Sequence, residues 1–142
     1  MAPIDGTVIP LEQIPDETFA TAILGPGCGI EPTGDTVYAP FDGTVTQIAT
    51  TLHAVGMTSS EGTELLIHVG MDTVDMKGQG FTALVKEGQK VTAGTPLLKV
   101  DLDAIRAAGH PTATAIIVTD GADEVKMLAE GDVVPGTPLF KV

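Results

Sequence analysis

Two short motifs each occur twice in this chain. Residues 2–8 (Ala-Pro-Ile-Asp-Gly-Thr-Val) return as residues 39–45 (Ala-Pro-Phe-Asp-Gly-Thr-Val). Residues 87–100, which begin Glu-Gly-Gln-Lys-Val, return one residue shorter as residues 130–142. Because both copies of the first motif precede both copies of the second, the repeats do not form a tandem array of stacked units. The pattern predicts a single domain, residues 1–142, built from two related halves that share one core.

The local sequence pattern is typical of β-structure. Seventeen glycines and ten prolines separate short runs that are rich in Val, Ile, Leu and Thr, as turns separate strands. Residues 44–48 (Thr-Val-Thr-Gln-Ile) have the alternation of a half-buried strand. Aromatic residues make up only 4%, so aliphatic side chains must fill the core. We therefore expect an all-β fold, an antiparallel β-sandwich or barrel with an internally duplicated motif and only short helices.

Three segments have some helical character. Residues 102–108 follow Asp101, a favourable N-cap residue, and precede Gly109, a favourable C-terminal stop. Residues 123–129 and residues 15–20 each have the length of a short helix or a single turn. We expect no longer helix than these.

Charge and hydropathy exclude several classes of protein. The net charge is −12, from 19 acidic and 7 basic residues, and such a surface repels nucleic acid and anionic lipid but attracts basic partners. No apolar run reaches the roughly 18 residues of a membrane-spanning helix, and no secretory signal is recognisable at the N-terminus. The single cysteine, Cys28, forms no internal disulfide and is interpreted as a packing residue. We expect a cytoplasmic protein, with no nucleic-acid partner and no membrane insertion.

A histidine lies within an aliphatic segment, Glu64-Leu65-Leu66-Ile67-His68-Val69-Gly70, and a second one, His53, lies fifteen residues upstream. Side chains alternate between the faces of a strand. Leu65, Ile67 and Val69 therefore form the better buried face, and His68 lies with Leu66 on the other face, in a shallow apolar patch. If the two strands are neighbours, then His53, His68 and Thr51 converge.

Imidazole is both a nucleophile and a leaving group near neutral pH. One histidine could attack a phosphoryl group while the other and Thr51 hydrogen-bond its oxygens. The attacking nitrogen must be unprotonated, and Gly70 lies where the chain could bend back to offer a carbonyl to the other ring nitrogen. Asp72 could orient a site residue or only cap a turn.

Three strings together resemble a known family: residues 51–54 (Thr-Leu-His-Ala), residues 65–74 (Leu-Leu-Ile-His-Val-Gly-Met-Asp-Thr-Val) and residues 77–81 (Lys-Gly-Gln-Gly-Phe). The chain resembles, over nearly its whole length, the glucose-type IIA domain of the bacterial phosphoenolpyruvate-dependent sugar phosphotransferase system. The resemblance implies a duplicated antiparallel β-sandwich. It also implies a phosphotransferase component with a phosphohistidine intermediate and no cofactor.

The resemblance further implies roles for individual residues and partners. His68 accepts phosphate from the small carrier phospho-HPr and passes it to a cysteine of a IIB domain. His53 steadies the phosphoryl group, Thr51 belongs to the same hydrogen-bond network, and Asp72 lies beside the site. Zinc at His53 and His68 is implied only when a partner supplies a carboxylate. Some family members have phenylalanines at positions 49, 66 and 69, where this chain has smaller apolar residues that keep an apolar docking rim.

The resemblance leaves the wider setting open. It implies a monomer as an isolated domain, located in the cytoplasm or at the inner membrane face as part of a IIABC permease. It does not define the sugar.

Two alternatives involve other chemistry. A biotinyl- or lipoyl-type carrier domain shares the turn motifs, and Met76-Lys77 would contain its modified lysine; such domains have about half this length and need no histidine pair. A zinc hydrolase on a related β-fold would use His53, His68 and Asp72 as ligands. However, the usual pair of histidines separated by one residue is absent from the sequence.

Overall fold

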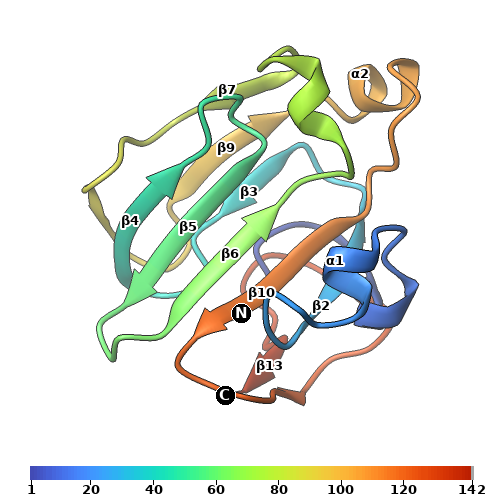
Figure 1. Cartoon of the computed structure of the whole chain (residues 1–142). Coiled ribbons are helices and arrows are strands. Elements are labelled where there is room, and N and C mark those ends of the chain that lie inside the picture. The colour runs from blue at the N-terminus through green and yellow to red at the C-terminus, as the bar shows by residue number, and fades with distance from the viewer. Residues whose placement is uncertain (142) are drawn as a thin grey trace.

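A computed structural model describes residues 1–141 of the chain. The fold is a β-sandwich in which all strand pairs are antiparallel (Figure 1). The strands are β1 (Gly6–Ile9), β2 (Gly27–Pro32), β3 (Thr36–Tyr38), β4 (Gly43–Ile48), β5 (Ala54–Ser59), β6 (Glu64–His68), β7 (Phe81–Ala83), β8 (Lys90–Val91), β9 (Pro96–Val100), β10 (Thr114–Asp120), β11 (Lys126–Met127), β12 (Asp132–Val133) and β13 (Phe140–Lys141). The short helices are η1 (Leu11–Gln13), α1 (Glu17–Ala20), η2 (Thr73–Met76) and α2 (Leu102–Ala107). The expected fold class is confirmed.

The largest sheet has eight strands in the order β12-β1-β2-β10-β6-β5-β4-β8. This order is symmetric about its centre, because the two copies of each sequence motif occupy corresponding strands in the two halves. In the first half Gly6 lies opposite Val133, and in the second half Gly43 lies opposite Val91. Each copy of the first motif therefore pairs, in the same register, with a copy of the second motif. The duplication seen in the sequence is a duplication of the sheet.

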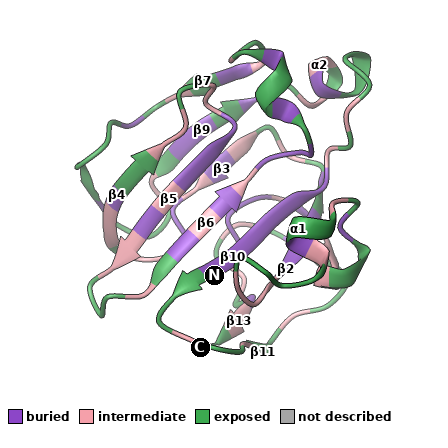
Figure 2. Ribbon diagram, in the orientation of Figure 1, coloured by how far each residue is buried: buried purple, intermediate pink, exposed green. Residues whose placement is uncertain are grey.

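The main core lies between the inner face of this sheet and the three-stranded sheet β3-β9-β7. Val55 and Ile67 of the large sheet belong to the same buried cluster as Val37 and Leu98 of the small one. Figure 2 shows the buried residues concentrated along β5, β6, β9 and β10. Cys28 lies in this cluster with 1% of its surface exposed, and burial raises the pKa of its thiol to about 12. The interpretation of Cys28 as a packing residue is confirmed.

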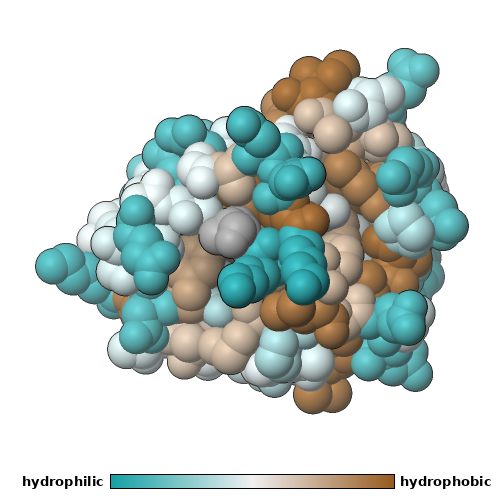
Figure 3. Space-filling view, turned by 90° about the horizontal axis from the view of Figure 1, so that it is seen from below, coloured by the Kyte–Doolittle hydropathy of each residue, from teal (hydrophilic) through white to brown (hydrophobic). Residues whose placement is uncertain are grey.

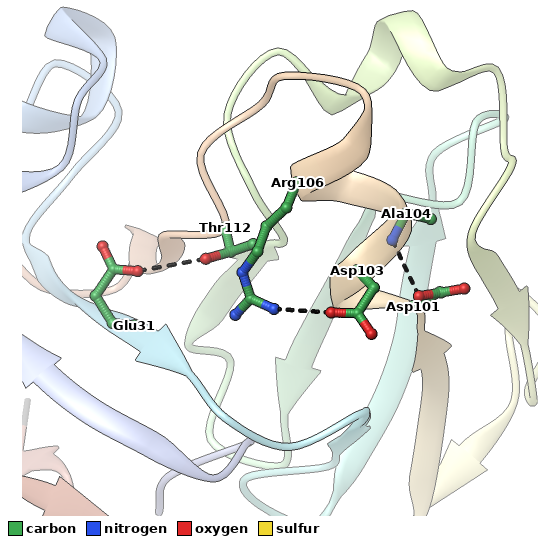
Figure 4. A network of polar contacts seen from close by, with 6 residues as sticks. All are labelled: Glu31, Asp101, Asp103, Ala104, Arg106 and Thr112. Atoms are coloured by element: carbon green, nitrogen blue, oxygen red, sulfur yellow. Dashed lines mark hydrogen bonds and ion pairs between the residues drawn. The ribbon is translucent and has the colours of Figure 1, made fainter.

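Two of the three expected helices are present. Asp101 caps α2 by accepting a hydrogen bond of 3.0 Å from the amide of Ala104, as Figure 4 shows. Asp16 caps α1 in the same way, through the amide of Thr18. The exposed Arg106–Asp103 pair in Figure 4, with an N···O distance of 3.3 Å, adds little stability because both groups remain in water.

The prediction of a helix at residues 123–129 is wrong. The segment instead forms β11, which pairs with β13 so that Met127 lies opposite Phe140. The amides of Leu128 and Ala129 both donate to the carbonyl of Leu139. Pairing with the C-terminal segment overrides a weak local preference for helix. The last residue of the second motif, Val142, lies outside the described residues.

The strand expected for residues 44–48 is present as β4, but it is not regular. Its pairing with β5 shifts register between Val45 and Gln47. A bulge of this kind places two residues opposite one. Val45 and Ile48, which lie three residues apart, can therefore both pack against the main core.

Candidate functional site

The two histidines lie side by side on the outer face of the large sheet. His53 immediately precedes β5 and His68 ends β6, and these two strands are paired with Ala54 opposite His68. The ring centroids of His53 and His68 are 4.8 Å apart, and the ring planes are close to perpendicular at 76°. The predicted convergence of the histidines is confirmed.

The predicted orientation of β6 is also confirmed. Leu65, Ile67 and Val69 are buried in the main core, whereas Leu66 and His68 are half-buried on the opposite face. Val69 is fully buried, so position 69 does not contribute to an apolar docking rim. The expectation that position 69 belongs to the docking rim is wrong, because Val69 points to the same inner face as Leu65 and Ile67.

A backbone carbonyl fixes the tautomer of His68. The Nδ1 atom of His68 lies 2.8 Å from the carbonyl oxygen of Gly70, and because a carbonyl only accepts, Nδ1 must carry the proton. The lone pair of the neutral ring is then on Nε2, which is free to attack. Gly70 adopts a φ of 72°, a left-handed conformation that bends the chain back and is easy only for glycine.

The tight turn before β5 positions the second histidine. The hydroxyl of Thr51 lies 2.7 Å from Nδ1 of His53. Between them Leu52 adopts a left-handed φ of 63°, and its amide donates to the carbonyl of Ala49. Left-handed backbone costs a leucine about 1–2 kcal/mol, so the turn holds Thr51 and His53 in place at some expense in stability.

The environment keeps both rings neutral near pH 7. The pKa of His68 is lowered to about 4, mainly because burial disfavours the charged ring and next because His53 is close. The hydrogen bond to Gly70 and the carboxylate of Asp16 act in the opposite direction. Burial also lowers the pKa of His53. A neutral imidazole is the form that can act as a nucleophile.

One residue that contacts His68 was not predicted from the sequence. Phe19 of α1 packs its ring against His68, with a centroid separation of 4.9 Å. It belongs to a second buried cluster with Ile14, Met71 and Ile117 on the outer face of the sheet. The only signal in the sequence was an aromatic residue in a short turn flanked by Pro15, and it did not define which face Phe19 would cover.

Asp72 lies next to the site in the chain, immediately before η2. It adopts a left-handed φ of 58°, and its side chain makes no capping hydrogen bond to η2. The residue is exposed, and its carbonyl accepts a hydrogen bond from the amide of Asp75. Asp72 therefore forms a turn, since aspartate tolerates this backbone conformation better than most residues.

Three hollows on the surface, with volumes of about 440, 440 and 860 Å³, have neither histidine in their walls. Within residues 1–141 no three His, Cys, Asp or Glu side chains are grouped so that they could hold a metal ion. None of the helices in this part of the chain is long and apolar enough to cross a membrane.

Comparisons with known proteins agree with this fold. The model of the family described as "phosphoenolpyruvate-dependent sugar phosphotransferase system, EIIA 1" matches residues 1–124. The chain is 44% identical over 128 residues to a glucose-specific EIIA component of Bacillus cereus, covering 89% of this chain and 78% of that protein. The glucose permease IIA of Mycoplasma capricolum has a TM-score of 0.89 and 34% identity, over 98% of this chain and 91% of that one.

Longer relatives contain the same sequence as one part. A glucose-specific EIICBA component of Streptococcus pneumoniae is 44% identical over 140 residues, which are 97% of this chain but 19% of that protein. The chain thus spans about a fifth of the length of the EIICBA relatives that it matches.

The fold and these matches define a β-sandwich protein of the IIA class. The chain belongs to the EIIA family of the phosphoenolpyruvate-dependent sugar phosphotransferase system. The resemblance drawn from the sequence is confirmed, and the carrier-domain and zinc-hydrolase alternatives are set aside.

Proposed function

We propose that residues 1–142 act as one phosphocarrier domain that accepts a phosphoryl group from phospho-HPr on His68 and passes it to a cysteine of a IIB domain during sugar uptake. The observation that carries this proposal is the hydrogen bond between Nδ1 of His68 and the carbonyl of Gly70. This hydrogen bond leaves the lone pair of the neutral His68 ring on Nε2, which is the atom that attacks phosphorus.

In the first step the Nε2 lone pair of His68 forms a bond to phosphorus while the bond to the donor histidine of HPr breaks. His53 is close enough to donate a hydrogen bond to a phosphoryl oxygen, because the two rings are 4.8 Å apart. The hydroxyl of Thr51, 2.7 Å from Nδ1 of His53, holds that ring in orientation. In the second step the thiolate of IIB attacks phosphorus, and the bond to Nε2 breaks. Positioning and charge stabilisation dominate in reactions of this type.

Asp72 is proposed to act beside the site through its turn, which follows Gly70 and leads into η2. No cofactor is required by either step. Zinc binding at His53 and His68 is proposed only where a partner protein supplies a further ligand.

Both partners are proposed to dock on the patch around His68. The half-buried Leu66 gives it apolar character, and the net charge of −12 favours partners with basic surfaces. The domain is proposed to be a monomer and to act in the cytoplasm, either alone or at the inner membrane face as part of a longer permease. Glucose or a related sugar is the proposed cargo of the pathway.

The proposal is tested by incubating the protein with phosphoenolpyruvate, enzyme I and HPr, followed by intact-mass spectrometry. We expect one acid-labile phosphate per chain, and none on His68→Ala. Phosphate on His68→Ala would show that the acceptor is another residue. Biotin or lipoate found on Lys77 would instead restore the carrier-domain alternative.

His53→Gln separates the two proposed steps. We expect this variant to retain some phosphorylation by HPr but to transfer phosphate to IIB at least about tenfold more slowly, because one positioned hydrogen bond in a phosphoryl-transfer site is lost. Rapid-quench measurement of both rates checks this. An unchanged rate to IIB would remove His53 from the mechanism.

A further inference from the structure

A groove of about 860 Å³ lies between the start and the end of the chain. Its walls are residues 8–12 at the end of β1 and in η1, Ala22, residues 26–28 at the start of β2, and residues 124–125 and 127–130 around β11. Lys126, in β11, is exposed but does not line the groove. Neither histidine lines it, and no step proposed above uses it. The groove therefore has no role yet.

Apart from three glutamates, the residues that line the groove are apolar or glycine. Met127 and Leu128 are 40% and 51% exposed, although both are large hydrophobic side chains, and they line the groove together with Val8 and Leu11. Seen from below, the molecule shows exposed hydrophobic patches bordered by hydrophilic side chains (Figure 3). Contiguous exposed apolar surface of this kind is typical of a binding site.

The rim of the groove is acidic. Glu12, Glu124 and Glu130 line it and are exposed, and none of the lysines or arginines of residues 1–141 is among its lining residues. An apolar lining with carboxylates on the rim is complementary to a segment that has hydrophobic side chains on one face and Lys or Arg on the other.

We propose that this groove is a docking surface for a basic amphipathic segment of a partner protein. An anionic membrane or a nucleic acid is disfavoured, because both would meet the carboxylates of the rim on a chain with net charge −12. A second copy of the chain is disfavoured for the same reason, since it has the same charge.

The groove shares two residues with the packing beside the histidines. Ile9 and Leu11 line the groove and also pack against the buried cluster that contains Phe19, the residue in contact with His68. The docking proposal does not depend on phosphorylation of His68, and the test below uses the unphosphorylated protein.

The probe is a synthetic peptide with leucines on one helical face and lysines on the other, labelled for fluorescence anisotropy. The control peptide has the same composition in scrambled order. We expect the amphipathic peptide to bind more tightly than the scrambled one, and amide NMR shifts to be confined to the non-proline residues of 8–12, 22, 26–28 and 124–130. Shifts elsewhere, or equal binding of the two peptides, would overturn the proposal.

Two variants and their matched controls locate the binding. Leu128→Ser should weaken it about tenfold through lost apolar burial, whereas Val134→Ser, at a side chain 59% exposed outside the groove, should change it less than about twofold. Glu124→Gln combined with Glu130→Gln should weaken binding several-fold and reduce its salt dependence. Glu61→Gln, at an exposed position outside the groove, should do neither.

Equal effects of groove variants and controls would overturn the proposal. So would a concentration-dependent dimer in light scattering that Leu128→Ser abolishes, because the occupant would then be a second copy. Binding to phosphatidylglycerol vesicles that depends on Leu128 would assign the groove to a membrane and also contradict it.

Discussion

The two halves of the large sheet arrange their strands alike but connect them differently. In the first half, the connection from β1 to β2 runs from residue 10 to residue 26 and forms η1 and α1. In the second half, the corresponding connection from β4 to β5 is a single turn, residues 49–53. The long connection covers the outer face of its half, and the short one leaves that face open.

The strand registers identify the residue that corresponds to His68. Ala54 lies opposite His68 between β5 and β6, as Gly27 lies opposite Ile117 between β2 and β10. Ile117 is completely buried under the long connection, with Phe19 in the same cluster, whereas His68 is half-buried. The same sheet position is thus part of a core in one half and a half-buried histidine in the other. The length of one connection makes the difference.

Gly29 and Gly56 occupy corresponding positions in the two halves of the sheet. Substituting them tests the difference between the halves with the largest expected effect on the free energy of unfolding. A Cβ atom at Gly29 would lie 2.7 Å from Cγ1 of Ile9, the last residue of β1, and 2.9 Å from Cγ1 of Ile14 in the long connection. We expect Gly29→Ala to lower the free energy of unfolding by about 1–3 kcal/mol, the usual cost of overpacking. Urea denaturation followed by circular dichroism measures it.

Gly56 occupies the corresponding position in the second half, and it is the control. A Cβ there would meet its nearest neighbour, Cβ of Gln47, at an ordinary contact distance of 3.4 Å. Gly56→Ala should be neutral or raise stability by up to about 1 kcal/mol, since alanine loses less conformational freedom than glycine. Equal destabilisation by both variants would mean that the connections do not distinguish the two halves.

The pH dependence of stability tests the same comparison with a smaller effect. The folded pKa of His68 is lowered from 6.5 to about 4, so the unfolded chain binds a proton more readily than the folded one. The contribution of this shift to the free energy of unfolding is fully present above pH 6.5. It is lost as the pH falls from 6.5 towards about 4. Since His68 is only half-buried, solvent screening reduces the loss to roughly 1–2 kcal/mol.

His68→Ile places the side chain of the corresponding residue, Ile117, in the open half. We expect the free energy of unfolding of this variant to fall less steeply between pH 6.5 and pH 4 than that of the wild-type protein, as equilibrium denaturation at several pH values can measure. The lowered pKa of His53 contributes to the slope that remains. Parallel curves for the two proteins would show that His68 does not titrate abnormally.

The sequence predicted the duplicated sheet well, because each motif repeats with its own turn residues and its own alternation. It also predicted that His68 lies on the outer face of the sheet, which follows from strand periodicity. The hydrogen bond from His68 to the Gly70 carbonyl was predicted as well, because glycine lets the chain bend back. It did not predict Phe19 beside His68 or the strand β11, since both depend on segments distant in the chain. Nor did it predict that the turn at Leu52 is left-handed, because leucine seldom adopts that conformation.

The central claim is that the tautomer fixed by Gly70 directs phosphate to one nitrogen of one histidine. Phosphorus and nitrogen NMR of the protein phosphorylated through HPr distinguishes the two ring nitrogens and, with His53→Gln as a reference, the two histidines. The account predicts a phosphoramidate at Nε2 of His68, because Nδ1 is held by the Gly70 carbonyl at 2.8 Å. A phosphoryl group at Nδ1 of His68, or on His53, would contradict it.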